Sequence, residues 1–173
     1  MRSAVAIGAG AGLIGGVVGA GVLSIVAIKG SEGEMTRAVG LVAHAAHSDS
    51  FALGWLVLMA AGLLIGALFG ALYWASGLRR ESAAWWATLY GLAWWAAGWF
   101  AVMPPPLKFA PWAATENPAL FQLAMAGLLA CLGYAAALAG AFTVFGPVTA
   151  ERIEARARTA RAASNGSLSP GRR

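Results

Sequence analysis

Charged side chains are scarce in this sequence of 173 residues. Lysine, arginine, aspartate and glutamate together make up 11% of the chain, whereas soluble domains carry about 25%. Segments 3–28, 50–78, 82–106 and 117–150 contain none of the four. Each segment is at least as long as the roughly 20 residues that a helix needs to cross a bilayer. This pattern excludes an ordinary soluble domain and predicts a membrane protein with four crossings.

Residue types that commonly carry chemistry are also rare. The chain has one cysteine, Cys131, and two histidines, so a disulfide within the chain is excluded. No carboxylate lies in the four uncharged segments. Intramembrane charges are typical of proton and ion pathways, and their absence argues against a pump. We therefore expect a protein without enzymatic activity and predict no cofactor.

Glycine, by contrast, is abundant, with 23 residues. In the first two uncharged segments it recurs at every fourth position. In lipid, small residues at this spacing allow two helix backbones to approach closely. The spacing therefore predicts that the first two helices pack face to face as a glycine zipper. The two rows are Gly8, Gly12 and Gly16, and Gly62, Gly66 and Gly70.

Two other interpretations of the first segment were weighed against helix packing. Gly10, Gly12 and Gly15 spell G-x-G-x-x-G, and Glu32 follows about 20 residues later, as in a dinucleotide-binding loop. Such a loop needs a strand before it, a helix after it and a parallel sheet, and no second strand–helix unit follows here. The other alternative is a secretory signal peptide, whose apolar region usually spans about 7–15 residues. The longer run here favours a transmembrane helix.

The sequence thus predicts an all-α fold, an integral membrane four-helix bundle made of two hairpins. In this prediction residues 1–150 form the transmembrane domain. Residues 151–173 form a basic cytoplasmic tail, which begins with helix-forming residues and ends in a polar stretch typical of disorder. The predicted helices cover about residues 4–28, 51–78, 83–103 and 118–148.

The basic residues predict the orientation of the chain. With both termini in the cytoplasm, nine basic residues lie on the cytoplasmic side and three on the outer side, in agreement with the positive-inside rule. The net charge of +5 then follows from topology, and we expect no nucleic-acid partner. The tail arginines either bind anionic lipid headgroups or serve only as a topology anchor. They are Arg152, Arg156, Arg158 and Arg161.

The two outer connections differ in kind. In the first, Ser31 and Glu34 fit a capping box, and the apolar residues after them keep a helical period. This predicts a short amphipathic juxtamembrane helix. The second connection contains five prolines between Pro104 and Pro118, which stiffen it because proline restricts the backbone. Asn117 is expected to cap the fourth helix, with Pro118 at its first position.

Two pairs of residues are candidate binding sites. His44 and His47 lie three residues apart at the predicted outer membrane edge. On one helix face, both imidazoles could reach a metal or a haem edge. Zinc requires three or four ligands, so the alternative is a pair of interfacial histidines without a ligand. Trp94 and Trp95 lie near the middle of the third helix, where they either pack or form a flat wall for a quinone, carotenoid, haem or lipid tail.

One part of the chain resembles a known group of proteins. The stretches "AHAAHSDSFALGWLVLMAAGLLIGALFGALYW" and "LYGLAWWAAGWFAVMPPP" resemble a group of small four-helix bacterial inner-membrane proteins that carries no established activity. The resemblance covers about residues 41–106 and depends on the histidine-bearing segment, the glycine row and the Trp-Trp to Met-Pro run. The group often has a further histidine where this chain has Leu58, and this departure weakens any inference of a metal site from the resemblance. The resemblance implies a location in the bacterial inner membrane.

These observations lead to two expectations about function. The first is a non-enzymatic inner-membrane protein that acts as an accessory, assembly or scaffold element of a membrane complex. Its partners would be membrane lipids and either other membrane subunits or a second copy of the chain. The alternative is a small transporter, channel or redox subunit that binds a metal, haem or quinone near the outer histidines and the tryptophan-rich helix.

Overall fold

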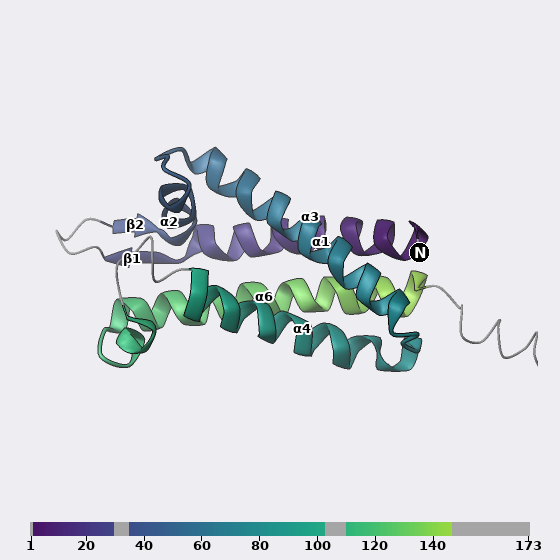
Figure 1. Ribbon diagram of the computed structural model, residues 1–173. Helices are drawn as coiled ribbons and strands as arrows, with labels where there is room; N and C mark the ends of the chain where they lie inside the picture. Colours follow the sequence, from purple (N-terminus) through teal and green to yellow (C-terminus); the bar gives the residue numbers. More distant parts are fainter. Residues whose placement is uncertain (1, 30–34, 103–109, 147–173) are drawn as a thin grey trace, which may run out of the picture.

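The computed structural model describes residues 2–29, 35–102 and 110–146, and most of them are helical (Figure 1). The all-α prediction is therefore correct apart from one small sheet. The α-helices within this part of the chain are α1 (Arg2–Ile25), α2 (Ala38–Ala45), α3 (Phe51–Ala75), α4 (Ala83–Ala97) and α6 (Pro118–Phe145); the strands are β1 (Ala27–Lys29) and β2 (Met35–Arg37).

Three of these helices are long and apolar enough to cross a membrane. They are α1, α3 and α6, with 24, 25 and 28 residues. Their length and composition indicate a membrane protein, as the uncharged segments predict. α4 has only 15 residues and is followed by a π-helical turn of five residues that begins at Gly98. Within the helix predicted at residues 83–103, the geometry thus changes from α to π at this glycine.

The chain leaves α1 earlier than predicted. α1 ends at Ile25 instead of near residue 28, because β1 begins two residues later and pairs antiparallel with β2. The β-branched residues at this point favour extended backbone. Ladder hydrogen bonds then satisfy the main-chain groups that a longer helix would have satisfied. The register pairs Ala27 with Arg37, Ile28 with Thr36 and Lys29 with Met35.

The predicted juxtamembrane helix corresponds to α2, which starts at Ala38 directly after β2. The Ala38 amide donates to the Val26 carbonyl at 2.9 Å, which ties the start of α2 to the end of α1. The predicted capping box of Ser31 and Glu34 lies outside the described residues. Asn117 caps α6 as expected: its side chain accepts from the Ala119 amide at 2.9 Å.

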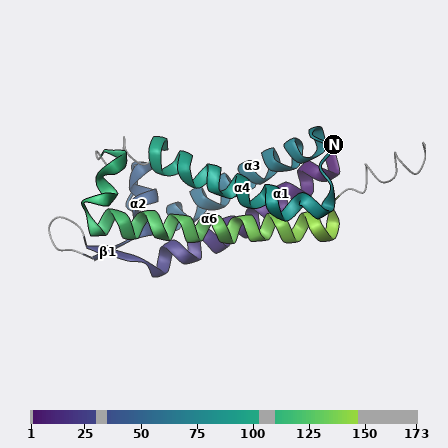
Figure 2. The same cartoon turned by 90° about the horizontal axis from the view of Figure 1, so that it is seen from below.

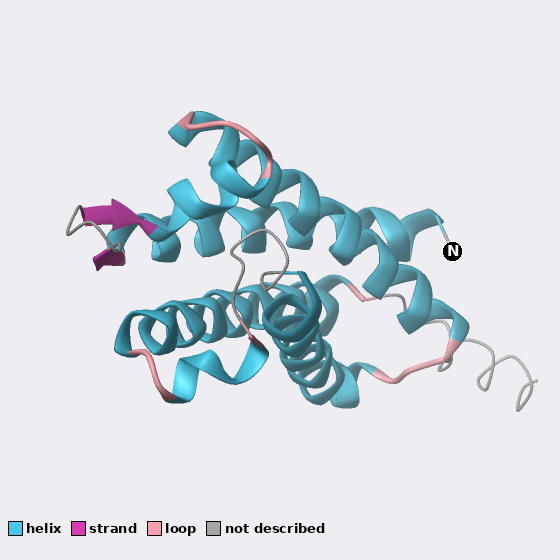
Figure 3. Ribbon diagram, turned by 60° about the vertical axis from the view of Figure 1, so that its left-hand side comes forward, coloured by secondary structure: helices cyan, strands magenta, loops and turns pink. Residues whose placement is uncertain are grey.

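The longer helices run lengthwise through the molecule, and α3 crosses the others obliquely (Figures 1 and 2). The start of α1, the turn between α3 and α4, and the end of α6 lie together at one end, which we call the turn end. The small sheet and α2 lie at the opposite end, the hairpin end (Figure 3). The described ends of the helical region are therefore on the same side of the molecule.

Helix packing follows a simple order. α1 packs against both α3 and α6, and α4 packs against α6, whereas α3 and α4 make little direct backbone contact. α1 consequently lies between α3 and α6, and α6 lies between α1 and α4. α3 and α4 share a turn but are held by different neighbours.

Small side chains form the buried face of α1, and many large apolar side chains lie on the outside of the molecule. All but one of the buried residues of α1 are glycine or alanine; the exception is Leu23. Ile14, Leu56 and Leu64 are at least 60% exposed. In water this arrangement would forfeit hydrophobic stabilisation. In a bilayer it costs little, because lipid tails are as apolar as leucine and backbone contact favours small residues.

Arg80 joins the α3–α4 turn to the end of α6. Its Nε and Nη2 atoms donate to the Gly146 carbonyl at 2.8 and 2.5 Å, and Gly146 is the C-cap residue of α6. The last carbonyls of a helix lack partners within the helix and carry its negative dipole end. Arg80 therefore stabilises the C-terminus of α6 as well as contributing to charge asymmetry.

Replacing Arg80 by alanine should lower the free energy of unfolding in detergent by about 1.5–3 kcal/mol, the range for hydrogen bonds made by charged groups. Denaturant titration followed by circular dichroism measures the change. Arg79→Ala is the matched control, because the Arg79 side chain is 71% exposed and lies 3.8 Å from the exposed Glu81 carboxylate. Exposed pairs contribute about 0–1 kcal/mol. Equal losses in the two variants would contradict the capping role.

Candidate functional site

The two glycine rows lie against each other between α1 and α3. A methyl group placed on Gly8 would overlap the carbonyl oxygen of Gly66, and one on Gly12 would overlap that of Gly62. The reverse placements collide in the same way. The carbonyl oxygens of each helix thus lie over glycine Cα atoms of the other, a geometry suited to weak Cα–H···O contacts. The opposed pairs are Ala4–Gly70, Gly8–Gly66, Gly12–Gly62 and Gly16–Leu58.

A second glycine face of α1 contacts α6. A Cβ atom on Gly15 would overlap the ring of Tyr134, and one on Gly19 would lie 3.6 Å from the Cβ atom of Ala130. Gly10 has open space around it. The nucleotide-loop alternative is wrong, because Gly10, Gly12 and Gly15 all lie inside α1 and no strand precedes them in the described chain. α1 uses its glycines to pack against two helices.

Polar side chains inside the apolar segments bond to main-chain carbonyls of neighbouring helices. Tyr134 Oη donates to the Gly62 carbonyl at 3.1 Å and Tyr90 Oη to the Ile65 carbonyl at 2.8 Å. Trp95 Nε1 donates to a carbonyl of α6, that of Ala124, at 2.9 Å. These bonds link α6 to α3, α4 to α3, and α4 to α6. Neither tyrosine was among the predicted site residues, although a hydroxyl at membrane depth requires a partner.

Trp94 and Trp95 do line a cavity. Its volume is about 170 Å³, and it lies toward the hairpin end between α1, α2, α3, α4 and α6. Trp99 and Cys131 also line it. Pockets for drug-sized ligands usually measure about 300–1,000 Å³, whereas a cavity near 150 Å³ accommodates a molecule the size of benzene. The space therefore suits a single small ring better than a whole haem.

The two histidines do not share a helix face. His44 lies in α2, but α2 ends at Ala45 and His47 adopts a left-handed conformation with φ of 58°. The Ser48 amide donates to the Ala43 carbonyl at 3.1 Å and the His47 amide to the His44 carbonyl at 2.9 Å. This is the Schellman arrangement that ends many helices. The expectation of two imidazoles on one helix face is wrong.

His44 has a different neighbour. Its Nδ1 atom lies 3.6 Å from a carboxylate oxygen of Asp49, and both side chains are largely exposed. Within the described residues no group of three or more histidine, cysteine or acidic side chains is close enough to hold a metal ion. A metal bound by His44 and His47 would therefore find no third protein ligand among the described residues.

The predicted lipid-headgroup site cannot be located. Its residues, Arg152, Arg156, Arg158 and Arg161, lie outside the described residues. The same holds for most of the proline-rich connection and for the tail at 151–173. The headgroup site, the stiff connection and the basic tail therefore stay predictions.

One buried polar atom lacks a partner in the described part of the chain. Tyr73 is 2% exposed, and its hydroxyl oxygen makes no hydrogen bond there. Its ring packs against Phe142 with 4.6 Å between the ring centres and is also near Phe69. Phe69 in turn contacts Tyr90 at 5.1 Å. This aromatic cluster joins α3, α4 and α6 near the turn end.

Comparison with known proteins finds no matching family model, no matching curated protein and no matching solved structure. The resemblance to small bacterial inner-membrane proteins therefore stays a prediction.

Gly12→Ala should destabilise the protein by about 1–3 kcal/mol, the typical effect of overpacking, because the added methyl group would separate α1 from α3. Gly10→Ala is the matched control on the same helix, where the methyl group meets open space. Alanine's higher helix propensity should leave that variant unchanged or more stable by up to about 1 kcal/mol. Unfolding in detergent, followed by circular dichroism, measures both. Effects of the same sign and size would contradict the close glycine contact.

Proposed function

We propose that the protein is a non-enzymatic element of a bacterial inner-membrane complex, where it serves as an accessory, assembly or scaffold subunit. One observation supports this most directly: the interior polar atoms of Tyr90, Trp95 and Tyr134 donate to main-chain carbonyls of neighbouring helices. Side chains that already make these hydrogen bonds hold the helices together and are not free to bind a substrate. Combined with glycine packing, they favour a rigid body that presents large apolar side chains outward.

The proposal includes a four-helix bundle with four crossings. α4 and the following π-helical turn together continue from Ala83 to Val102. At about 1.5 Å per residue, this length supports a fourth crossing despite the change of helix type. Both ends of the helical region lie at the turn end (Figures 1 and 2), as an even number of crossings requires. The excess of basic residues on that side then favours cytoplasmic termini.

Labelling of single cysteines in intact cells tests this topology, in a background where Cys131 is replaced by alanine. Asp49→Cys, at the hairpin end, should react with a membrane-impermeant maleimide. Arg79→Cys, at the turn end, should react only after the cells are permeabilised. Both side chains are exposed, so accessibility within the protein does not separate them. Labelling of position 79 but not 49 in intact cells would reverse the proposed orientation.

The tryptophan-lined cavity favours a second candidate, a small redox or transport subunit. Three tryptophans around about 170 Å³ offer flat surfaces for an aromatic or quinone ring. This candidate predicts that the protein carries such a molecule or a metal, whereas the scaffold proposal predicts that it does not.

Purification in mild detergent from native membranes distinguishes the two. The scaffold proposal predicts migration as a complex larger than the 17.7 kDa chain, no visible absorption band and no stoichiometric metal. Gly12→Ala should release the chain from the complex, because the variant disturbs the rigid body, and Gly10→Ala should not. A haem absorption band, bound quinone or one metal per chain in a protein that migrates alone would contradict the scaffold proposal.

A further inference from the structure

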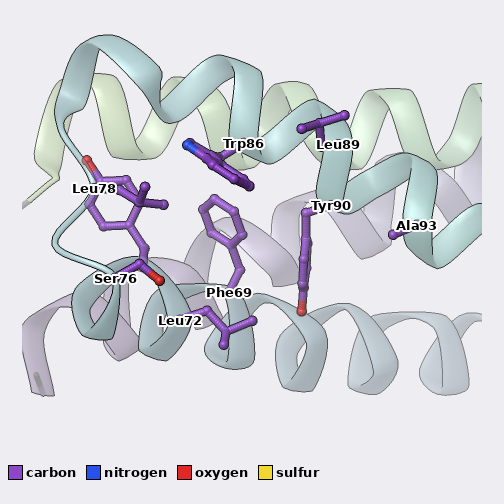
Figure 4. Close-up of a pocket in the computed structure, with 9 residues that line it drawn as sticks. Phe69, Leu72, Ser76, Leu78, Trp86, Leu89, Tyr90 and Ala93 are labelled. Atoms are coloured by element: carbon purple, nitrogen blue, oxygen red, sulfur yellow. The ribbon is translucent and has the colours of Figure 1, made fainter.

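A second, larger hollow lies between α3 and α4 at the turn end. It measures about 390 Å³, within the usual range for ligand pockets, and side chains of both helices point into it (Figure 4). Phe69 and Leu72 line it from α3, and Trp86, Leu89 and Ala93 line it from α4. We call this hollow the α3–α4 cleft.

The cleft follows from the way the helices are held. α3 is fixed to α1 by the glycine rows, and α4 is fixed to α6, where a Cβ atom on Gly91 would lie 2.9 Å from the Cys131 carbonyl oxygen. The two helices share a turn but have little backbone contact of their own. The Tyr90 hydroxyl spans the gap to the Ile65 carbonyl at 2.8 Å. The space is therefore built into the packing of the protein.

The polarity of the cleft changes along its length. Ser76 and Leu78, next to the turn, lie at one end, and Ala93 lies at the other (Figure 4). Apart from Ser76, the lining consists of aliphatic and aromatic side chains. Of the two tyrosines among them, Tyr90 has its hydroxyl bonded to the Ile65 carbonyl, and the Tyr73 hydroxyl has no partner in the described chain. α3 is long enough to span a membrane, so the cleft runs from the membrane surface at the turn toward the bilayer interior. A phospholipid has the same order of groups, with a polar head at the surface and acyl chains below.

The cleft is also open at its side. Leu72 is 48% exposed, Trp86 44% and Leu89 37%. Leu72 belongs to α3, which is long enough to span a membrane, and Trp86 and Leu89 belong to α4, the proposed fourth crossing. With both helices in the membrane, the opening faces the bilayer, and a lipid chain can enter sideways.

An exposed arginine follows the end of the cleft that is next to the turn. Arg79 follows Leu78 directly, and its side chain is 71% exposed. Its nearest acidic group, the Glu81 carboxylate, lies 3.8 Å away and is 79% exposed, so the pair is weak. Arg80 is already bonded to the Gly146 carbonyl. Arg79 is therefore a guanidinium available to a phosphate group, for which arginine is well suited.

We propose that the α3–α4 cleft binds one phospholipid of the leaflet that the turn faces, with an acyl chain between Phe69, Leu89 and Ala93 and the phosphate near Arg79. This site goes beyond the scaffold role and requires that α3 and α4 both lie in the membrane, as in the proposed four-crossing topology. A bound lipid fills the space that the two helices leave between them and couples α4 to α3.

Native mass spectrometry of the detergent-purified protein, titrated with phosphatidylglycerol or phosphatidylcholine, tests the proposal. The wild-type chain should bind a first phospholipid more tightly than later ones, with phosphatidylglycerol preferred. Ala93→Phe fills the cleft and should weaken the first binding step about tenfold, a factor equivalent to about 1.4 kcal/mol. Ala84→Phe is the matched control: Ala84 is exposed, lies on the opposite face of α4 and does not line the cleft.

A second variant tests the phosphate contact independently, in case Ala93→Phe does not fold. Arg79→Gln lies in the exposed turn and should remove most of the preference for phosphatidylglycerol while phosphatidylcholine binding is retained. Circular dichroism and thermal unfolding establish that each variant is folded. The proposal is overturned if wild-type protein binds successive lipids with equal affinity, or if Ala84→Phe weakens the first step as much as Ala93→Phe. Loss of the larger complex with lipid binding intact would contradict the scaffold role alone.

Discussion

Direct backbone contact between α1 and α3 is the constraint on which the rest of the structure depends. In lipid there is no hydrophobic force to bring helices together, so dispersion and weak polar contacts at short range must do so. The opposed glycines allow this, because any Cβ atom on Gly8, Gly12, Gly62 or Gly66 would collide with the facing backbone. The contact fixes α1 against α3 from Ala4 to Gly16, and the neighbouring Gly15 and Gly19 allow α6 to pack on another face of α1.

Two features follow from this position of α1 between α3 and α6. α3 is drawn toward α1 and away from α4, so the gap between α3 and α4 is left to side chains and contains the cleft beside Phe69 and Trp86. The hydroxyls of Tyr90 and Tyr134 then reach carbonyls of α3. Such bonds contribute about 0.6 kcal/mol each on average in membranes. These hydrogen bonds fix how each helix is rotated about its own axis, once the glycine contacts have brought the helices together.

The sequence predicted the features that depend on composition and on a four-residue period. Uncharged segments locate the three long spans to within a few residues, and the spacing of the glycines predicts which faces of α1 and α3 meet. The sequence did not predict features that depend on main-chain hydrogen bonds or on contacts between residues far apart in the chain. The strands after Ile25 and the left-handed His47 arise where local backbone hydrogen bonds end a helix, and the π-helical turn at Gly98 arises where the bonding pattern of a helix changes. Arg80 looked like a topology charge, because its partner, the Gly146 carbonyl, is 66 residues away.

The most direct test of the central contact leaves the sequence unchanged. Protein labelled with ¹³C only at glycine, reconstituted in phospholipid bilayers, can be measured by magic-angle-spinning NMR for through-space correlations between glycine carbonyl carbons and glycine Cα carbons. The account predicts correlations between Gly12 and Gly62 and between Gly8 and Gly66, pairs that are far apart in sequence and opposed between α1 and α3. A spectrum with correlations only between glycines of the same helix would contradict it.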